Sequence, residues 1–333
     1  MEEQTKPSLL DIPLTDLLKP TWEKAFYAGI FLVAVVSRFW DLGARAMSHD
    51  ESLHALYSYY LYNGSGYIHN PMMHWPFLFH ANALIYFLFG DSDYTARIMP
   101  ALFGVFMTLS PLLLRRWLGR LGTAITSILL LISPSSLYYS RYIRNDIYMT
   151  VWTMLLIAAL FHFLRSHKPR WLYLGVAVLT LSLATKETAY IFGYIGLMFL
   201  ITAFLWERVS NRRQIWLYLG GAVLSVILMI AAYLLGRAPA VGAEAGEEAS
   251  SAMKLVVSMV ALLAGTIPAA LVSASLIRSR HPQPSRIIEA IRSVTRQTWL
   301  IAAVIMVLIY SLLFTTFFTN PVGLGKNVVN SRE

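Results

Sequence analysis

The chain has 333 residues, of which 57% are hydrophobic and only 14% carry a charge. Charged residues make up about a quarter of an ordinary soluble domain, so this composition excludes that class of protein. The absence of cysteine excludes disulfides and thiolate chemistry. The net charge of +9 comes from short basic clusters beside apolar runs, a distribution typical of membrane topology rather than of nucleic-acid binding.

Apolar runs of about 20 residues recur along the chain, and each is long enough to cross a bilayer as a helix. They lack the alternating polarity of membrane β-strands. In chain order, the candidate spans are Trp22–Trp40, Ala96–Trp117, Gly122–Tyr138, Ile147–Leu164, Trp171–Ala184, Thr188–Trp206, Ile215–Leu235, Met253–Ile277 and Thr298–Thr319. We therefore predict an all-α polytopic membrane protein with about nine transmembrane helices.

The run Pro76–Gly90 is shorter than the usual span of about 20 residues. If it does not cross the membrane, 17 of the 27 Lys and Arg residues fall in cytoplasmic segments, as the positive-inside rule requires. If it crosses, every later basic cluster changes side. We therefore expect an interfacial or re-entrant helix here, inside one long outer loop, 41–95.

This topology divides the chain into three parts. Residues 1–21 form a cytoplasmic tail without a cleaved signal sequence, and residues 22–319 form the membrane domain. Residues 320–333 form an outer tail. The predicted location is the plasma (inner) membrane of a prokaryote, with a cytoplasmic amino terminus and an extracytoplasmic carboxyl terminus.

The long outer loop is expected to contain an amphipathic helix lying on the bilayer, with tyrosines at headgroup level. Its apolar residues recur at helical spacing: Leu53, Leu56, Tyr57, Tyr60 and Leu61.

Acidic residues follow the first span directly, in the sequence His49-Asp50-Glu51. A carboxylate there can take a proton from an acceptor hydroxyl or hold a divalent metal that bridges a phosphate. Glu51 and His54 share a helical face, so they are candidate metal ligands. The alternative is that both acidic residues only stabilise the start of a helix through its dipole.

Cationic side chains on the outer side are candidates for binding an anionic headgroup. Arg141 and Arg144 stand on the side that is normally poor in arginine, and the planar guanidinium suits phosphate. Asp146 follows them in the same segment and is a further candidate, and the alternative for this group is an Arg–Asp pair that caps a helix end. Arg38, Arg45 and Arg97 add further outer positive charge.

Two further outer segments hold candidates for substrate binding. His74 lies in a tract with two histidines and two prolines, where imidazoles can meet a phosphate or a metal. Lys186 and Glu187 lie at a junction between two short spans, where ionisable residues normally pair or serve function.

Several motifs resemble the GT-C superfamily of polyprenyl-phosphate-sugar-dependent glycosyltransferases, which includes protein O-mannosyltransferases and the lipid A aminoarabinose transferase. The acidic HDE motif after the first span and the tract from His69 to Gly104 carry this resemblance. The segments ISPSSLYYSRYIRNDIYM, LATKETAYIFGYI and FTTFFTNPVGL resemble most closely the flippase-activity-associated branch of archaeal-type N-glycosylation.

The resemblance implies an outer-face active site in the first long loop, with Asp50 and Glu51 as its catalytic carboxylates. His74 matches the donor-phosphate region, although the lysine of the family is absent there and His69-Asn70-Pro71 stands in its place. Arg141, Arg144 and Lys186 match branch motifs. Relatives usually continue further, so we expect this chain to be shorter than they are.

We expect a glycosyltransferase that transfers a hexose or pentose from a lipid-phosphate donor to a glycan, lipid or protein acceptor of the cell envelope. A divalent metal is an open cofactor, and a larger membrane assembly is an open partner. Two alternatives stay open: a non-catalytic subunit that assists flipping or binds lipid-linked sugars, and a structural subunit of a membrane complex.

Overall fold

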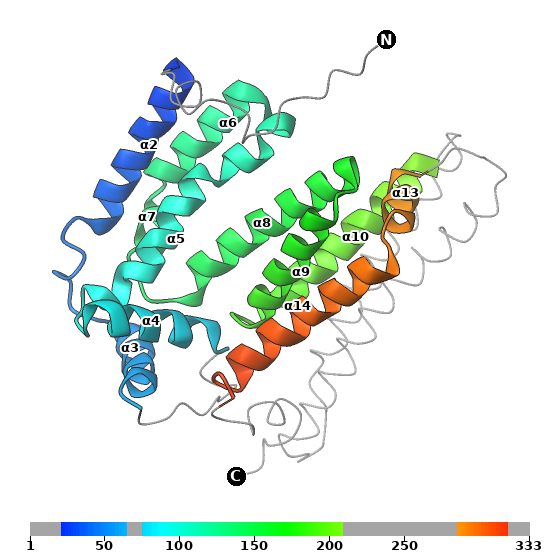
Figure 1. The fold of residues 1–333 in the computed structure, drawn as a ribbon. Helices are drawn as coiled ribbons and strands as arrows, with labels where there is room; N and C mark the ends of the chain where they lie inside the picture. The colour runs from blue at the N-terminus through cyan, green and yellow to red at the C-terminus, as the bar shows by residue number, and fades with distance from the viewer. Residues whose placement is uncertain (1–20, 65–74, 209–284, 319–333) are drawn as a thin grey trace, which may run out of the picture. The chain divides into compact units, whose positions relative to one another are not determined.

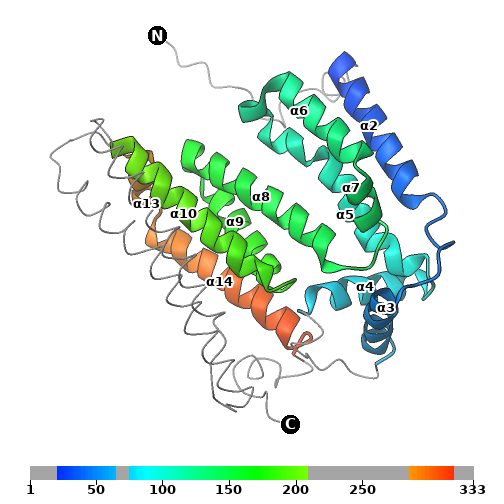
Figure 2. The ribbon, with the colours of Figure 1, turned by 180° about the vertical axis from the view of Figure 1, so that it is seen from behind.

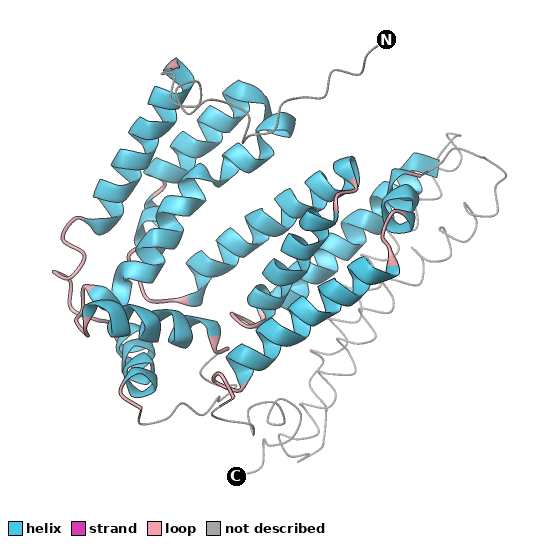
Figure 3. Ribbon diagram, viewed as in Figure 1, coloured by secondary structure: helices cyan, strands magenta, loops and turns pink. Residues whose placement is uncertain are grey.

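The computed structural model describes residues 21–64, 75–208 and 285–318, and every regular element in these ranges is a helix (Figure 3). This confirms the all-α prediction. The chain divides into two compact units, residues 1–192 with 295–333 and residues 193–294. In the second unit, the described elements are the part of α10 from Gly193 onwards and α13 (Arg286–Arg292).

Helices α2, α5 and α6 of the first unit lie side by side (Figures 1 and 2). α2 (Trp22–Phe39) begins at Thr21, whose hydroxyl accepts a hydrogen bond from the Lys24 backbone N–H. α5 (Ile98–Leu109) follows the 3₁₀ turn η2 (Thr95–Arg97), and a second 3₁₀ turn, η3 (Ser110–Leu114), leads into α6 (Arg115–Ile132).

The chain reverses direction at Gly119, which has a φ of 70° inside α6. Only glycine adopts such a conformation without steric cost. The apolar stretch Thr95–Ile132 contains 38 residues. As a straight helix it would be about 57 Å long, almost twice the thickness of the bilayer core. Since α6 packs back against η3 and α5, this stretch forms a helical hairpin.

A short break separates α6 from α7 (Pro134–Tyr139), so the predicted single span Gly122–Tyr138 is wrong. Pro134 has no backbone N–H to donate to the preceding turn. The buried Arg38 of α2 compensates, because its guanidinium donates to the carbonyls of Leu130 (3.2 Å) and Leu131 (3.3 Å).

The predicted outer-loop helices are present as α3 (His49–Tyr62) and α4 (Phe77–Phe89), which pack against each other. α4 has 13 residues, too few to cross a bilayer, and in Figure 1 it runs at an angle to its neighbour α5. In α3 the apolar side chains Leu56 and Tyr60 remain exposed, as an interfacial helix requires.

The buried face of α3 is polar, which its apolar periodicity did not predict. Glu51, His54 and Ser58 are the buried residues of this helix. Glu51 is buried because it meets Arg97, and His54 stacks on Phe79 of α4 with 5.8 Å between the ring centroids.

Helix α8 (Asn145–Ser166) packs against α9 (Pro169–Leu183), which in turn packs against α14 (Arg296–Phe314). His167 ends α8 in the left-handed conformation, and Pro169 starts α9, so the two helices form a hairpin. The next helix, α10, spans Thr188–Arg208.

Among the described residues, three helical stretches are long and apolar enough to cross a membrane: Thr95–Ile132, Asn145–Ser166 and Arg296–Phe314. The count of nine spans is therefore not confirmed. The predicted spans Ile215–Leu235 and Met253–Ile277 lie outside the described residues, as do the tails 1–20 and 319–333.

Candidate functional site

Helix α3 begins with a capping box. The Ser48 hydroxyl accepts from the Glu51 backbone N–H (3.5 Å), and the Glu51 carboxylate accepts from the Ser48 backbone N–H (3.3 Å). The Ser48 hydroxyl also pairs with the Tyr142 hydroxyl at 2.6 Å. The start of α3 is thereby tied to the segment 140–144, which precedes α8.

Glu51 is the centre of a buried polar cluster, which we call the Glu51 cluster. Its fully buried carboxylate accepts from Arg97 Nε (3.0 Å), Arg97 Nη2 (3.1 Å) and Arg45 Nη2 (2.7 Å). It also accepts from the Ile143 backbone N–H (3.3 Å). Arg97 is 1% exposed, and its Nη1 donates to the carbonyls of Leu42 and Arg45.

This arrangement does not fit the predicted metal pair of Glu51 and His54. Both Glu51 oxygens already accept hydrogen bonds from guanidinium groups, so binding a cation would break a buried ion pair. His54 Nδ1 is bonded to the Asp50 carbonyl oxygen at 2.7 Å. In the part of the chain that the structure describes, no three metal-ligating side chains gather.

Asp50 has quite different surroundings, because its side chain is 50% exposed. Its Oδ2 lies 3.6 Å from Arg144 Nη1, and Arg144 Nε lies 3.2 Å from Asp146 Oδ2. Lys186 Nζ completes the series by donating to Asp146 Oδ1 at 2.7 Å. We call Asp50, Arg144, Asp146 and Lys186 the ion-pair chain.

The ion-pair chain brings three elements together. Asp50 lies in the first turn of α3, Asp146 in the first turn of α8, and Lys186 in the turn between α9 and α10. Acidic residues favour a helix amino terminus because they complement its dipole, which explains why both carboxylates lie there.

A cavity of about 380 Å³ lies at the far end of the ion-pair chain, and we call it the Lys186 cavity. Its lining combines charged groups, hydroxyls and apolar side chains: Asp146, Met149, Thr150, Thr153, Met154, Lys186, Thr188 and Phe192. Such a mixture suits a ligand with a polar head and an apolar tail.

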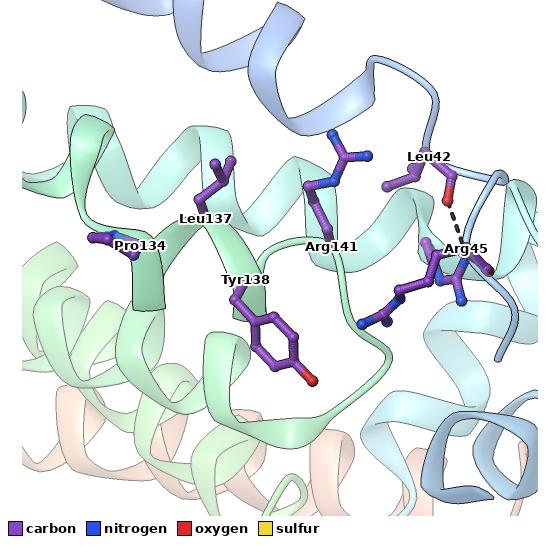
Figure 4. Close-up of a pocket in the computed structure, with 7 residues that line it drawn as sticks. Leu42, Arg45, Pro134, Leu137, Tyr138 and Arg141 are labelled. Carbon is purple, nitrogen blue, oxygen red and sulfur yellow. Dashed lines mark hydrogen bonds between the residues drawn. The ribbon is translucent and has the colours of Figure 1, made fainter. Parts of the chain in front are cut away.

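Arg141 lies apart from the ion-pair chain, although it precedes Arg144 by three residues. Its guanidinium donates to the carbonyls of Ser37 (2.9 Å) and Asp41 (3.2 Å) at the end of α2. It lines a second cavity of about 330 Å³, which we call the Arg45 cavity (Figure 4). The remaining walls are Leu42, Arg45, Arg97, Pro134, Leu137 and Tyr138.

The structure thus gathers Asp50, Arg144, Asp146 and Lys186, and it separates Arg141 and Arg97 from them. Glu187 is exposed and does not line the Lys186 cavity. His74 lies outside the described residues.

Sequence reasoning missed the capping role of Ser48, and it identified Arg45 only as an outer positive charge, without its contacts. Ser48 had a usable signal, because Ser-x-x-Glu before an apolar helix is the pattern of a capping box. Arg45 had none, since its contacts with Tyr138 and Tyr142 join segments about 90 residues apart.

Comparison with known families gives one match in sequence. Residues 68–235 match the family model described as dolichyl-phosphate-mannose-protein mannosyltransferase. No individual curated protein matches the sequence at a significant level.

The similar solved structures are of an oligosaccharyltransferase from Archaeoglobus fulgidus. The form tethered to an acceptor peptide containing the NVT sequon is 16% identical with a TM-score of 0.50, over 94% of this chain and 40% of that chain. The complex with an inhibitory peptide and a dolichol-phosphate is 16% identical with a TM-score of 0.47, over 93% and 39%.

A third form of that enzyme, with Zn and sulfate, is 17% identical with a TM-score of 0.49, over 88% of this chain and 41% of that chain. At these identities, the likeness to the peptide-tethered form concerns the fold alone. The chain spans about two-fifths of the length of these structures.

Proposed function

The chain belongs to the dolichyl-phosphate-mannose-protein mannosyltransferase family of GT-C membrane glycosyltransferases, and we propose that it is itself a glycosyltransferase. The proposed reaction is transfer of a sugar from a polyprenyl-phosphate donor to an acceptor hydroxyl at the extracytoplasmic membrane face. The observation that supports it most is the ion-pair chain, which links the half-exposed carboxylate of Asp50 to the partly apolar cavity lined by Lys186.

Asp50 is the proposed general base. Among the described acidic residues at the start of α3, it is the one whose carboxylate reaches solvent, whereas Glu51 is fully buried. A base must come within hydrogen-bond reach of the hydroxyl that it deprotonates, so exposure is a requirement for this role.

Lys186 and Arg144 are the proposed partners of the donor phosphate. In the free protein, the two cations of the ion-pair chain are balanced by the two carboxylates of Asp50 and Asp146. When the bond from sugar to phosphate breaks, negative charge grows on the leaving phosphate. The cationic groups of Lys186 and Arg144 are already held nearby, so they can donate hydrogen bonds that stabilise this charge without further reorganisation.

Glu51 has a positioning role in this proposal. It does not touch the reacting atoms, but its carboxylate binds the capping Ser48, Arg97 and the Ile143 backbone N–H. These bonds hold the first turn of α3 against the segment that leads to Arg144. Asp50 and Arg144 are thereby kept within reach of each other. No step is assigned to a metal, because Glu51 and His54 do not fit one.

The test compares Asp50→Asn with Asp93→Asn, a control that changes another exposed carboxylate of the same outer loop. Purified variants are placed in vesicles with a radiolabelled polyprenyl-phosphate sugar and membrane acceptors. Asp50→Asn should lower transfer by at least about 100-fold, the contribution of a general base, while Asp93→Asn should leave it unchanged. Unchanged transfer by Asp50→Asn would remove Asp50 from the mechanism. Donor binding without turnover in the wild type would favour the lipid-sugar-binding subunit instead.

A further inference from the structure

The Arg45 cavity differs in electrostatics from the Lys186 cavity. Three guanidinium groups, those of Arg45, Arg97 and Arg141, line it. Among the described residues, the one carboxylate bonded to any of them is Glu51, so positive charge is in excess by two. The ion-pair chain beside the Lys186 cavity is balanced. An anionic group therefore finds a larger excess of positive charge in the Arg45 cavity than in the Lys186 cavity.

Two of the three arginines can bond a ligand directly. Arg97 is 1% exposed and donates to Glu51 and two carbonyls. Its charge therefore adds to the positive electrostatic potential of the cavity, but it does not bond a ligand directly. The Arg45 side chain is 47% exposed and, within the described part of the chain, makes a single hydrogen bond, to Glu51. Arg141 uses two of its five N–H groups on carbonyls.

The N–H groups of Arg45 that are not bonded to Glu51 are held in position, because two tyrosine rings lie beside its guanidinium. Its guanidinium lies 5.5 Å from the ring centroid of Tyr138 and 5.1 Å from that of Tyr142. Figure 4 shows Arg45 extending toward Tyr138, while Arg141 points toward the end of α2. Stacked guanidinium groups lose less freedom when they bind, which favours a planar or tetrahedral oxyanion.

The other walls indicate that the anion is carried by a lipid. Leu42, Pro134 and Leu137 make the cavity partly apolar. Beside it, the last turns of α2 and α6 expose Val36, Trp40, Leu129 and Ile132. Exposed apolar helix faces that end in Trp and Tyr are typical of the boundary between acyl chains and headgroups, and basic pockets between membrane helices bind lipid headgroups.

We propose that the Arg45 cavity binds the phosphate of an anionic phospholipid headgroup, with Arg45 and Arg141 as donors and the acyl chains along α2 and α6. This site is separate from the Lys186 cavity and does not depend on the proposed transfer reaction. It would anchor the turn between α2 and α3, which carries Arg45 and precedes Asp50.

Native mass spectrometry of the delipidated full-length chain tests this proposal, with phosphatidylglycerol, phosphatidylcholine of the same acyl chains, and inorganic phosphate as probes. Phosphatidylglycerol should bind at least about tenfold more tightly than phosphatidylcholine, and Arg45→Gln should remove about tenfold, the loss expected for one charge-assisted hydrogen bond. Arg115→Gln is the matched control, because Arg115 is similarly exposed (41%) and pairs with Glu23 elsewhere. It should keep the preference.

A second variant guards against a folding effect of Arg45→Gln. Tyr138→Leu leaves every bond of the Glu51 cluster in place and should weaken phosphatidylglycerol binding about two- to fivefold by removing a cation–π contact. Equal binding of the two lipids by the wild type, or equal losses in Arg45→Gln and Arg115→Gln, would overturn the proposal. Displacement of phosphatidylglycerol by inorganic phosphate at similar concentrations would show that the ligand is a soluble phosphate instead.

Discussion

Asp50 and Glu51 are neighbours in sequence but have opposite surroundings, with side chains 50% and 0% exposed. The sequence predicts that only one of two adjacent helical residues faces a given centre. It does not reveal which one, because the partner of Glu51 is Arg97, 46 residues further along the chain. The capping pattern from Ser48 to Glu51 was readable, whereas the ion pair required the fold.

The Glu51 cluster yields a prediction about stability. Glu51→Gln leaves the buried Arg97 without its counter-ion, and breaking a buried pair in this way costs about 3–5 kcal/mol. Arg45→Gln removes a half-exposed partner and should cost below about 1 kcal/mol. Thermal unfolding in detergent, followed by intrinsic fluorescence, compares the two variants. Equal unfolding temperatures would contradict the central place given to Glu51.

Among the helices, the apolar runs of the sequence correspond to helical segments, and the short run Pro76–Gly90 forms the 13-residue helix α4. The break between α6 and α7 was missed, although Pro134 marks it in the sequence. A proline in an apolar run can also be accommodated in a kinked helix. The sequence alone therefore does not show that the helix breaks here, because it does not reveal that Arg38 bonds the carbonyls that the break at Pro134 leaves without a donor.

Helix α5 packs closely against the end of α7 at Gly104 and Ser140. A Cβ on the buried Gly104 would overlap the Ser140 side chain. Gly104→Ala should therefore destabilise the protein by about 1–3 kcal/mol, and the second change Ser140→Gly should restore part of the loss.

Gly29→Ala is the control for this experiment. Gly29 lies in α2, where an added Cβ meets nothing within 4 Å, so the substitution should be neutral or slightly stabilising. Thermal unfolding of the three single variants and the double variant is the measurement. A Gly104→Ala protein as stable as Gly29→Ala would show that α5 and α7 are not in close contact.

Across the whole molecule, two groups of charged side chains lie at opposite ends of α2. Glu23 at its beginning pairs with Arg115 (2.7 Å), which places a predicted cytoplasmic cluster at that end. Arg38 and the chain leading to the Glu51 cluster lie at the other end, about 27 Å away along 18 helical residues. The distribution of Lys and Arg predicts that the end of α2 with Glu23 and Arg115 faces the cytoplasm. Which end faces the outside remains a prediction.

Single-cysteine labelling tests this orientation most directly, because the chain contains no cysteine of its own. Ser52→Cys reports on the exposed face beside Asp50, and Arg120→Cys reports on the chain reversal at Gly119 within α6, where Arg120 is 84% exposed. In intact cells, a membrane-impermeant maleimide should label position 52 at once and position 120 only after permeabilisation. Labelling of both positions from the same side, or of position 120 alone, would contradict an extracytoplasmic transfer site.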